Sequence, residues 1–190
     1  MILQNFSKLA TFGPKLMAPA LQELSNYSAS DSWLPTLWSR HVERQSVAGS
    51  PHHSTETIYL RGPVEFTLKD YFSIDTIDFD FEQQCLPELT KLAGKVFDLL
   101  EAKGLLGRIL ITKLKPHSEI DEHHDEGPYS DHFQRVHLSL VSSAQDYLAC
   151  GNESVSMKPG ELWWFNHKVT HMAENWGAEP RIHMILDYRT

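Results

Sequence analysis

The segment Arg108-Ile-Leu-Ile-Thr-Lys-Leu114 marks a change in the character of the chain. Aliphatic and β-branched residues run through it, which is typical of a buried strand. More short strands are expected after it, with turn residues between them, at 134–141, 153–157, 161–165 and 181–188. Several short strands separated by turns indicate a β-sandwich or barrel. We therefore predict a mostly β fold with flanking helices, whose core is a double-sheet jelly roll.

The residues before this segment predict helices and two strands. Apolar residues recur at helical spacing over 83–103, and Gly104 stands where a C-cap glycine belongs. A shorter helix is expected over 18–24, and strands are expected at 57–61 and 64–68. This half of the chain is therefore predicted to give the jelly roll an α-helical N-terminal support.

Length and composition favour one globular domain. The 190 residues suit a single domain over 1–190, with a support region over 1–105 and the jelly-roll core over 106–190. Lys and Arg number 17 and Asp and Glu 25, so the formal charge is −8, and neither nucleic acid nor a membrane surface is an expected partner. Cys85 and Cys150 are too few for a disulfide framework and are expected to be buried thiols. Without an apolar leader or membrane span, a cytoplasmic location is expected.

The pattern His123-His124-Asp125 suggests a metal site. Because side chains alternate along a strand, His123 and Asp125 point to the same side and His124 points away. One further histidine from another strand would complete a facial triad, the arrangement of non-haem Fe(II) oxygenases. The alternative is a polar loop, since the surrounding run 119–131 is rich in acids and histidines.

Two arginines are predicted to face the interior. Arg135 and His137 share one face of their strand, and Arg181 shares a face with His183 and Asp187. A planar guanidinium suits a carboxylate, because it binds both oxygens at once. Buried ion pairs are the alternative for both arginines, since an unpaired buried charge is costly. All these features explain one another if the barrel holds a small dicarboxylate beside a metal, as 2-oxoglutarate chemistry requires.

The second half of the chain resembles the aspartyl/asparaginyl β-hydroxylase family, which are Fe(II)/2-oxoglutarate-dependent oxygenases with a cupin-like double-stranded β-helix. The resemblance covers about residues 108–189. It is carried, in order, by the lead-in to the first histidine, the next strand, the turn and strand before the distal histidine, the distal-histidine segment and the last strand: 112–125, 135–138, 159–166, 171–177 and 181–187. It implies that 106–190 form the catalytic core.

The resemblance implies a complete set of iron ligands. His123, Asp125 and His171 match the family's metal-binding positions. His167 is the competing third ligand, but it directly follows a predicted strand and is interpreted as a loop residue. Halogenating relatives in the wider superfamily lack the carboxylate, so the presence of Asp125 favours hydroxylation.

The resemblance also implies where 2-oxoglutarate binds. Arg181 matches the residue that clamps the cosubstrate carboxylate, and Arg135 and His137 match supporting contacts. Thr112 is expected to add a hydroxyl. Asn175 is expected to hold the turn after the distal histidine.

The activity implied is hydroxylation of an unactivated C–H bond in an amino acid, a peptidyl side chain or a related small molecule. The reaction uses O2 and gives succinate and CO2 as co-products. A cupin-like metal enzyme without 2-oxoglutarate, or a non-enzymatic metal-binding jelly-roll module, are the alternatives. No substrate-binding residue is assigned. His52, His53 and Arg61 are interpreted as loop or surface residues, and a place at the mouth of the pocket is the alternative for them.

Overall fold

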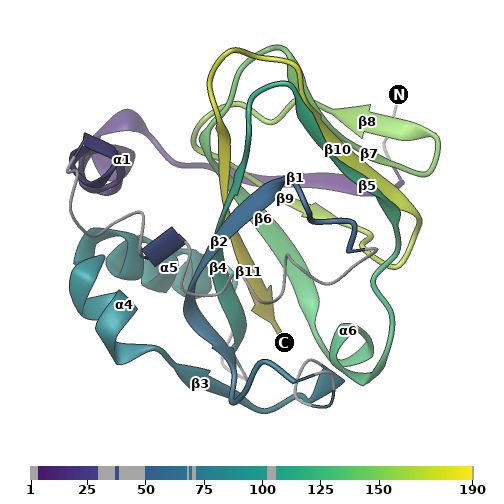
Figure 1. Cartoon of the computed structure of the whole chain (residues 1–190), viewed down its shortest axis with the longest axis horizontal. Coiled ribbons are helices and arrows are strands. Elements are labelled where there is room, and N and C mark those ends of the chain that lie inside the picture. Colours follow the sequence, from purple (N-terminus) through teal and green to yellow (C-terminus); the bar gives the residue numbers. More distant parts are fainter. Residues whose placement is uncertain are drawn as a thin grey trace.

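Two antiparallel sheets form the body of the molecule (Figure 1). The computed structural model describes residues 4–29, 37–38, 50–67, 69, 72–101 and 106–189. The large sheet has seven strands in the order β1 (Phe6–Thr11), β9 (Glu161–Phe165), β6 (Gln134–Val141), β11 (Arg181–Tyr188), β4 (Leu106–Leu114), β2 (Thr55–Pro63) and β3 (Thr76–Asp78). The small sheet has four, β5 (Ser118–His123), β10 (His171–Asn175), β7 (Asp146–Cys150) and β8 (Glu153–Val155). The predicted mostly β jelly roll is confirmed.

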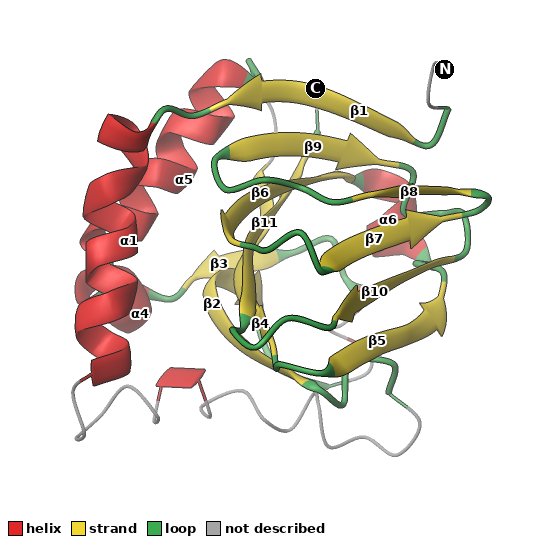
Figure 2. Ribbon diagram, turned by 90° about the horizontal axis from the view of Figure 1, so that it is seen from above, coloured by secondary structure: helices red, strands yellow, loops and turns green. Residues whose placement is uncertain are grey.

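Three helices cover one face of the large sheet, and the small sheet lies over the other (Figure 2). The three helices are α1 (Pro14–Ala29), α4 (Asp80–Cys85) and α5 (Pro87–Leu99). A short helix, α6 (Pro128–His132), lies away from them on the other side of the sheets. The apolar stripe of α5, which includes Leu89 and Val96, is buried in the main hydrophobic core. Each fully buried aliphatic side chain of this kind contributes about 1.5–3 kcal/mol. The helices therefore stabilise the large sheet by packing against one of its faces.

Strand β11 shows how the sequence separates the core from the cavity. Ile182, Met184 and Leu186 point into the core beneath the helices. Arg181 and His183, on the alternate positions, line the space between the sheets. Because side chains alternate along a strand, one strand serves both the stable core and the polar cavity.

The predicted helix 83–103 is interrupted in the structure. Helix α4 ends at Cys85 and α5 begins at Pro87, with Leu86 in a non-helical conformation between them. The physical reason is the proline, which disfavours helical geometry at the preceding residue and is well suited to a first helical position. Gly104 lies outside the described residues. The expected helix over 18–24 is part of the longer α1.

The long strands match the prediction and several short ones do not. The segments predicted at 57–61, 108–114, 134–141, 161–165 and 181–188 are strands, and the one at 153–157 is a strand only over Glu153–Val155. The expected strand at 64–68 is wrong, because 64–67 form bends and Leu68 is outside the described residues. Strands β1, β3, β5, β7 and β10 were not predicted.

The one-domain division at residue 105 stays a prediction. Two strands that precede that boundary belong to the large sheet, where β1 pairs with β9 and β2 pairs with β4. Among the described residues, no helix is long and apolar enough to cross a membrane.

Candidate metal centre and its cavity

The three predicted ligands meet at the ends of two neighbouring strands. His123 ends β5 and His171 begins β10, and the two residues are direct partners across the small sheet. His123 Nε2 lies 4.0 Å from Asp125 Oδ1. One nitrogen or oxygen from each of His123, Asp125 and His171 lies within 4.8 Å of the others. His124 is exposed and pairs with Glu126, so it points away as predicted. The predicted strand over 123–125 is wrong, however, because β5 ends at His123.

The backbone sets which nitrogen each histidine presents. His123 Nδ1 lies 2.7 Å from the Asp121 carbonyl oxygen, and His171 Nδ1 lies 2.9 Å from that of Val169. Since a carbonyl only accepts, each Nδ1 carries the hydrogen and each Nε2 keeps a free lone pair. Burial lowers the pKa of His171 to about 4, so that its ring is neutral at pH 7. Two imidazoles and one carboxylate are the donor set that suits non-haem Fe(II).

Asp125 lies beyond the end of β5 and is placed by contacts from elsewhere. Its backbone N–H donates to the His167 carbonyl oxygen at 3.0 Å. Burial alone would raise the pKa of its carboxyl, but the Arg135 guanidinium, aided by His167 and His171, holds it well below its usual range. The carboxylate is therefore ionised at neutral pH, as a metal ligand must be.

His167 lies beside the candidate centre and is not one of the three converging donors. It lies in the turn after β9, as predicted, but its side chain is buried. Its Nδ1 is 3.3 Å from Asp125 Oδ2 and 3.3 Å from Ser130 Oγ. Sequence reasoning missed this contact, because nothing in the local pattern shows that the turn folds back over Asp125.

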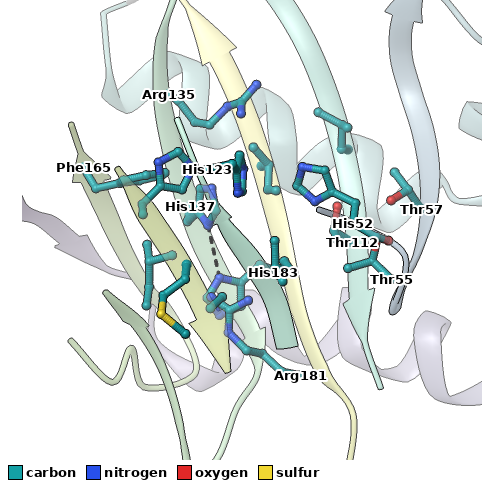
Figure 3. A pocket seen from close by; sticks show the side chains of 17 residues that line it. His52, Thr55, Thr57, Thr112, His123, Arg135, His137, Phe165, Arg181 and His183 are labelled. Atoms are coloured by element: carbon teal, nitrogen blue, oxygen red, sulfur yellow. Dashed lines mark hydrogen bonds between the residues drawn. The ribbon is translucent and has the colours of Figure 1, made fainter. Parts of the chain in front are cut away.

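A cavity of about 780 Å³, its open mouth included, lies between the sheets beside these ligands (Figure 3). It is lined by every predicted cosubstrate residue: Thr112, Arg135, His137 and Arg181. His52 lines it as well, which is the alternative that the sequence left for this residue. Thr55, Thr57 and His183 also line it, although no role was predicted for their side chains. The three threonines come from the adjacent strands β2 and β4, where Thr57 and Thr112 are direct partners. Arg61 is elsewhere, ion-paired with Asp78 at 2.9 Å.

We call the residues Arg181, His137 and His183 the Arg181 end of the cavity, and the three ligands with Arg135 the metal end. Figure 3 shows His137 and His183 between His123 and Arg181. The ion pair that was the alternative for Arg181 is not formed with Asp187, which lies near the opposite end of β11 and binds Arg135. Arg181 is 5% exposed, and its Nη2 has no hydrogen-bond partner in the described part of the chain. Burial lowers the pKa of Arg181 to about 10, against the attraction of Asp146, so it stays charged at pH 7.

The two histidines beside Arg181 are neutral and share a contact. Their Nδ1 atoms lie 3.4 Å apart, shown as the dashed line in Figure 3. Burial and, next, the charge of Arg181 hold the pKa of both His137 and His183 well below the usual range. His183 Nε2 is buried and has no partner among the described residues. The Arg181 end thus holds two unpartnered polar atoms.

Arg135 makes a different set of contacts. Its Nε and Nη2 bind both oxygens of Asp187 at 2.7 and 3.0 Å, and its Nη1 binds Asp125 Oδ2 at 2.5 Å. The buried ion pair that the sequence left open as an alternative is therefore formed. Asn175 also behaves as predicted: its amide bonds Glu179 O at 2.9 Å and Gly177 N–H at 3.0 Å, which holds the turn after β10.

The two sheets and the converging donors define a class of protein, a cupin-like double-stranded β-helix protein with a candidate 2-His-1-carboxylate centre. A family model described as Aspartyl/Asparaginyl beta-hydroxylase matches residues 53–190. The chain belongs to this family, which confirms the resemblance found in the sequence.

Solved structures are similar in fold at low identity. An oxidoreductase of the 2OG-Fe(II) oxygenase family from Burkholderia pseudomallei has a TM-score of 0.50 and 14% identity, over 90% of this chain and 89% of that one. A predicted oxalate decarboxylase from Thermotoga maritima has a TM-score of 0.36 and 17% identity, over 50% and 74% of the two chains. A Cupin 2 conserved barrel domain protein from Salinispora arenicola has a TM-score of 0.34 and 11% identity, over 44% and 63%. No curated protein matches the chain significantly.

Proposed function

We propose that this chain is an Fe(II)/2-oxoglutarate-dependent oxygenase that hydroxylates an unactivated C–H bond. The substrate is an amino acid, a peptidyl side chain or a related small molecule, and O2 is the oxidant. Membership of a hydroxylase family supports the reaction class. His123, Asp125 and His171 would hold the iron, since their donor atoms converge and suit it.

The observation that carries the proposal is the buried Nη2 of Arg181, which has no hydrogen-bond partner among the described residues. A buried donor without a partner costs about 1–3 kcal/mol, and a buried charge without a partner costs more. Arg181 lines the same cavity as His123 and His171. A dicarboxylate that reaches from the metal to this guanidinium would satisfy the donor and bring a counter-charge. 2-Oxoglutarate has a metal-chelating keto acid at one end and a second carboxylate at the other, which is the chemistry this cavity needs.

When bound, Fe(II) and 2-oxoglutarate would supply the oxidising power, with succinate and CO2 as co-products. The chain's own part is binding, orientation and exclusion of water. Arg181 would bind the remote carboxylate bidentately. His137 and His183, kept neutral by burial and by Arg181, place hydrogen-bonding groups beside it without adding charge. Apolar residues, among them Ile120, Leu148 and Phe165, form the apolar part of the cavity wall.

Anaerobic addition of Fe(II) and then 2-oxoglutarate to the full chain tests the proposal. A weak visible charge-transfer band is expected, together with binding of 2-oxoglutarate in calorimetry. Arg181→Gln should lose the cosubstrate and keep the metal. Arg61→Gln is the matched control, because Arg61 is paired with Asp78 and does not line the cavity.

Other results would overturn the proposal in distinct ways. Metal binding without any 2-oxoglutarate binding would favour a cupin-like enzyme with other chemistry. Unfolding on chelation without turnover would favour a structural metal. Once binding is established, succinate formation measured across amino acids and short peptides identifies the substrate class.

A further inference from the structure

The geometry around Arg135 differs from that of a ligand-binding arginine. All three guanidinium nitrogens bind protein carboxylates, two of them on Asp187 and one on Asp125. Three of its five N–H groups, one on each nitrogen, are therefore already bound to protein carboxylates, whereas Arg181 keeps an unpartnered Nη2 among the described residues. Two arginines that line one cavity thus have different tasks.

The contact with Asp187 follows from sheet register. Arg135 on β6 and Asp187 on β11 are direct partners across the large sheet. Asp187 is 1% exposed, and its Oδ2 also accepts the Tyr129 hydroxyl at 2.9 Å. Tyr129 is itself fixed, because its oxygen accepts the Arg108 N–H at 2.7 Å and its ring lies 3.8 Å below the Arg108 guanidinium. The far side of Arg135 is therefore anchored on buried, well-packed groups.

Gly107 makes room for this anchor. A Cβ at residue 107 would lie 2.6 Å from the Tyr129 oxygen and 2.8 Å from Asp187 Cβ, closer than a side chain tolerates. The hydroxyl and the carboxylate can therefore meet only because β4 carries no side chain at this point.

On its other side, Arg135 fixes how Asp125 faces the candidate metal. Asp125 Oδ2 is bound by Arg135 Nη1 and lies 3.3 Å from His167 Nδ1. Asp125 Oδ1 is the oxygen on the side of His123 Nε2, at 4.0 Å. A carboxylate held in this way offers one oxygen to a metal. Asp187 supplies a second negative charge, which offsets the cationic Arg135 that would otherwise repel a metal dication.

We propose that Arg135, anchored by Asp187 and Tyr129, is a positioning residue that restricts Asp125 to one-oxygen coordination, and that it does not bind the cosubstrate. This inference rests on the proposed function, since it takes Asp125 as a metal ligand. Outer partners of metal ligands act by orienting the ligand and tuning its charge. Arg135 therefore affects the metal, and Arg181 affects the dicarboxylate.

The test measures two affinities separately in the full chain freed of metal. Mn(II) binding is measured by calorimetry, and 2-oxoglutarate binding is then measured at saturating Mn(II). Arg135→Gln is expected to weaken Mn(II) binding by about 10- to 100-fold, as loss of an outer partner usually does. Its 2-oxoglutarate affinity at saturating metal is expected to stay at the wild-type value. Arg181→Gln, the same chemical change on the other arginine, should show the reverse.

Two further measurements separate positioning from a general structural defect. The double variant Arg135→Gln/Asp187→Asn removes both charges, so that Asp187 is not left as an unpaired buried carboxylate. It should fold, as thermal melting reports, and still bind Mn(II) as weakly as Arg135→Gln. The visible spectrum of bound Co(II), which reports the number of ligand atoms, should change in both variants and stay unchanged in Arg181→Gln.

Wild-type Mn(II) affinity in both Arg135 variants would overturn the inference. So would loss of 2-oxoglutarate affinity at saturating metal in Arg135→Gln, since Arg135 would then be a cosubstrate contact while the proposed function stands. A wild-type chain that binds Mn(II) but no 2-oxoglutarate refutes the proposed function, and the effect of Arg135 on the metal still decides the inference. A wild-type chain that binds no Mn(II) refutes both.

Discussion

The two ends of the cavity differ in how completely the protein satisfies its own polar groups. At the metal end, Arg135 binds Asp125 and Asp187 with all three nitrogens. At the Arg181 end, Arg181 Nη2 and His183 Nε2 are buried without a partner in the described part of the chain. Folding alone rarely leaves such atoms, because buried polar groups are nearly always hydrogen-bonded. The difference indicates that the fold itself organises the metal end, and it supports the proposal that a ligand completes the Arg181 end.

The largest expected effect tests whether the metal end is assigned correctly. His171→Ala removes one of the three converging donors and should abolish Mn(II) binding measured by calorimetry. His167→Ala leaves all three donors and removes a neighbour of Asp125 Oδ2, so it should weaken binding without abolishing it. Equal loss of Mn(II) binding in both variants would mean that His167 is a ligand. The set of residues that forms the metal end would then have to be revised.

A second prediction compares the two arginines by their effect on stability instead of binding. Arg135→Met leaves Asp187 buried without its counter-charge and should lower the free energy of unfolding by about 3–5 kcal/mol. Arg181→Met removes a buried charge whose Nη2 has no partner in the described part of the chain, so it should leave stability unchanged or raise it by about 1–3 kcal/mol. Urea unfolding of both metal-free variants measures the difference. Similar destabilisation in both would show that Arg181 is as fully paired as Arg135.

The pH dependence of stability tests whether the two histidines at the Arg181 end are neutral in the folded chain. Burial and Arg181 hold the pKa of His137 and His183 well below the usual range in the folded chain. Below about pH 6.5 the unfolded chain takes up protons that these rings do not, so the free energy of unfolding falls as pH falls. Each ring contributes up to about 1.4 kcal/mol per pH unit.

Urea unfolding of the metal-free chain at pH 7.5, 6.5 and 5.5 measures this slope. His183→Gln should make this slope shallower by the contribution of one histidine ring. His124→Gln, which removes an exposed histidine beside Glu126, is the matched control and should keep the wild-type slope. An unchanged slope in His183→Gln would mean that this ring takes up its proton over the same pH range in the folded and the unfolded chain.

Strand alternation explains how much of the site was predictable. It puts Arg181 and His183 on the cavity face, and this inference needs only the period of a strand. It does not explain Asp125, because β5 ends at His123 and Asp125 is placed by contacts with His167 and Arg135. Sequence left Arg135 open between an ion pair and a ligand contact, because the choice depends on Asp187, which lies 52 residues away and meets it only through sheet register.

The strands that were missed show why the rest was not predictable. Strand β10 buries His171, Ala173 and Asn175 on alternate positions, so its inward face is partly polar and lacks the apolar signal of a strand. Strand β1 is exposed over most of its length at the edge of the large sheet, where pairing with β9 gives it its conformation. A strand that lines a polar site and a strand at the edge of a sheet both have fewer buried apolar residues. A strand prediction depends on those residues, so it fails for both. The resemblance found β10 as the distal-histidine segment where the pattern did not.

The smallest expected effect concerns the anchor behind the metal end. Tyr129→Phe removes one hydroxyl that donates to Asp187 and accepts the Arg108 N–H. Burial and Asp187 raise the pKa of Tyr129, so in the wild type this hydroxyl stays protonated and remains a donor.

Loss of the hydroxyl should lower the free energy of unfolding by about 1–3 kcal/mol, because the Arg108 N–H is left unsatisfied. Asp187 keeps both contacts to Arg135, so Arg135 stays in place and Mn(II) affinity should fall less in Tyr129→Phe than in Arg135→Gln. Urea unfolding and calorimetry on the same protein measure the two effects. If Tyr129→Phe weakened Mn(II) binding as much as Arg135→Gln, the position of Asp125 would depend on the whole buried network, and Arg135 would be only one link in it.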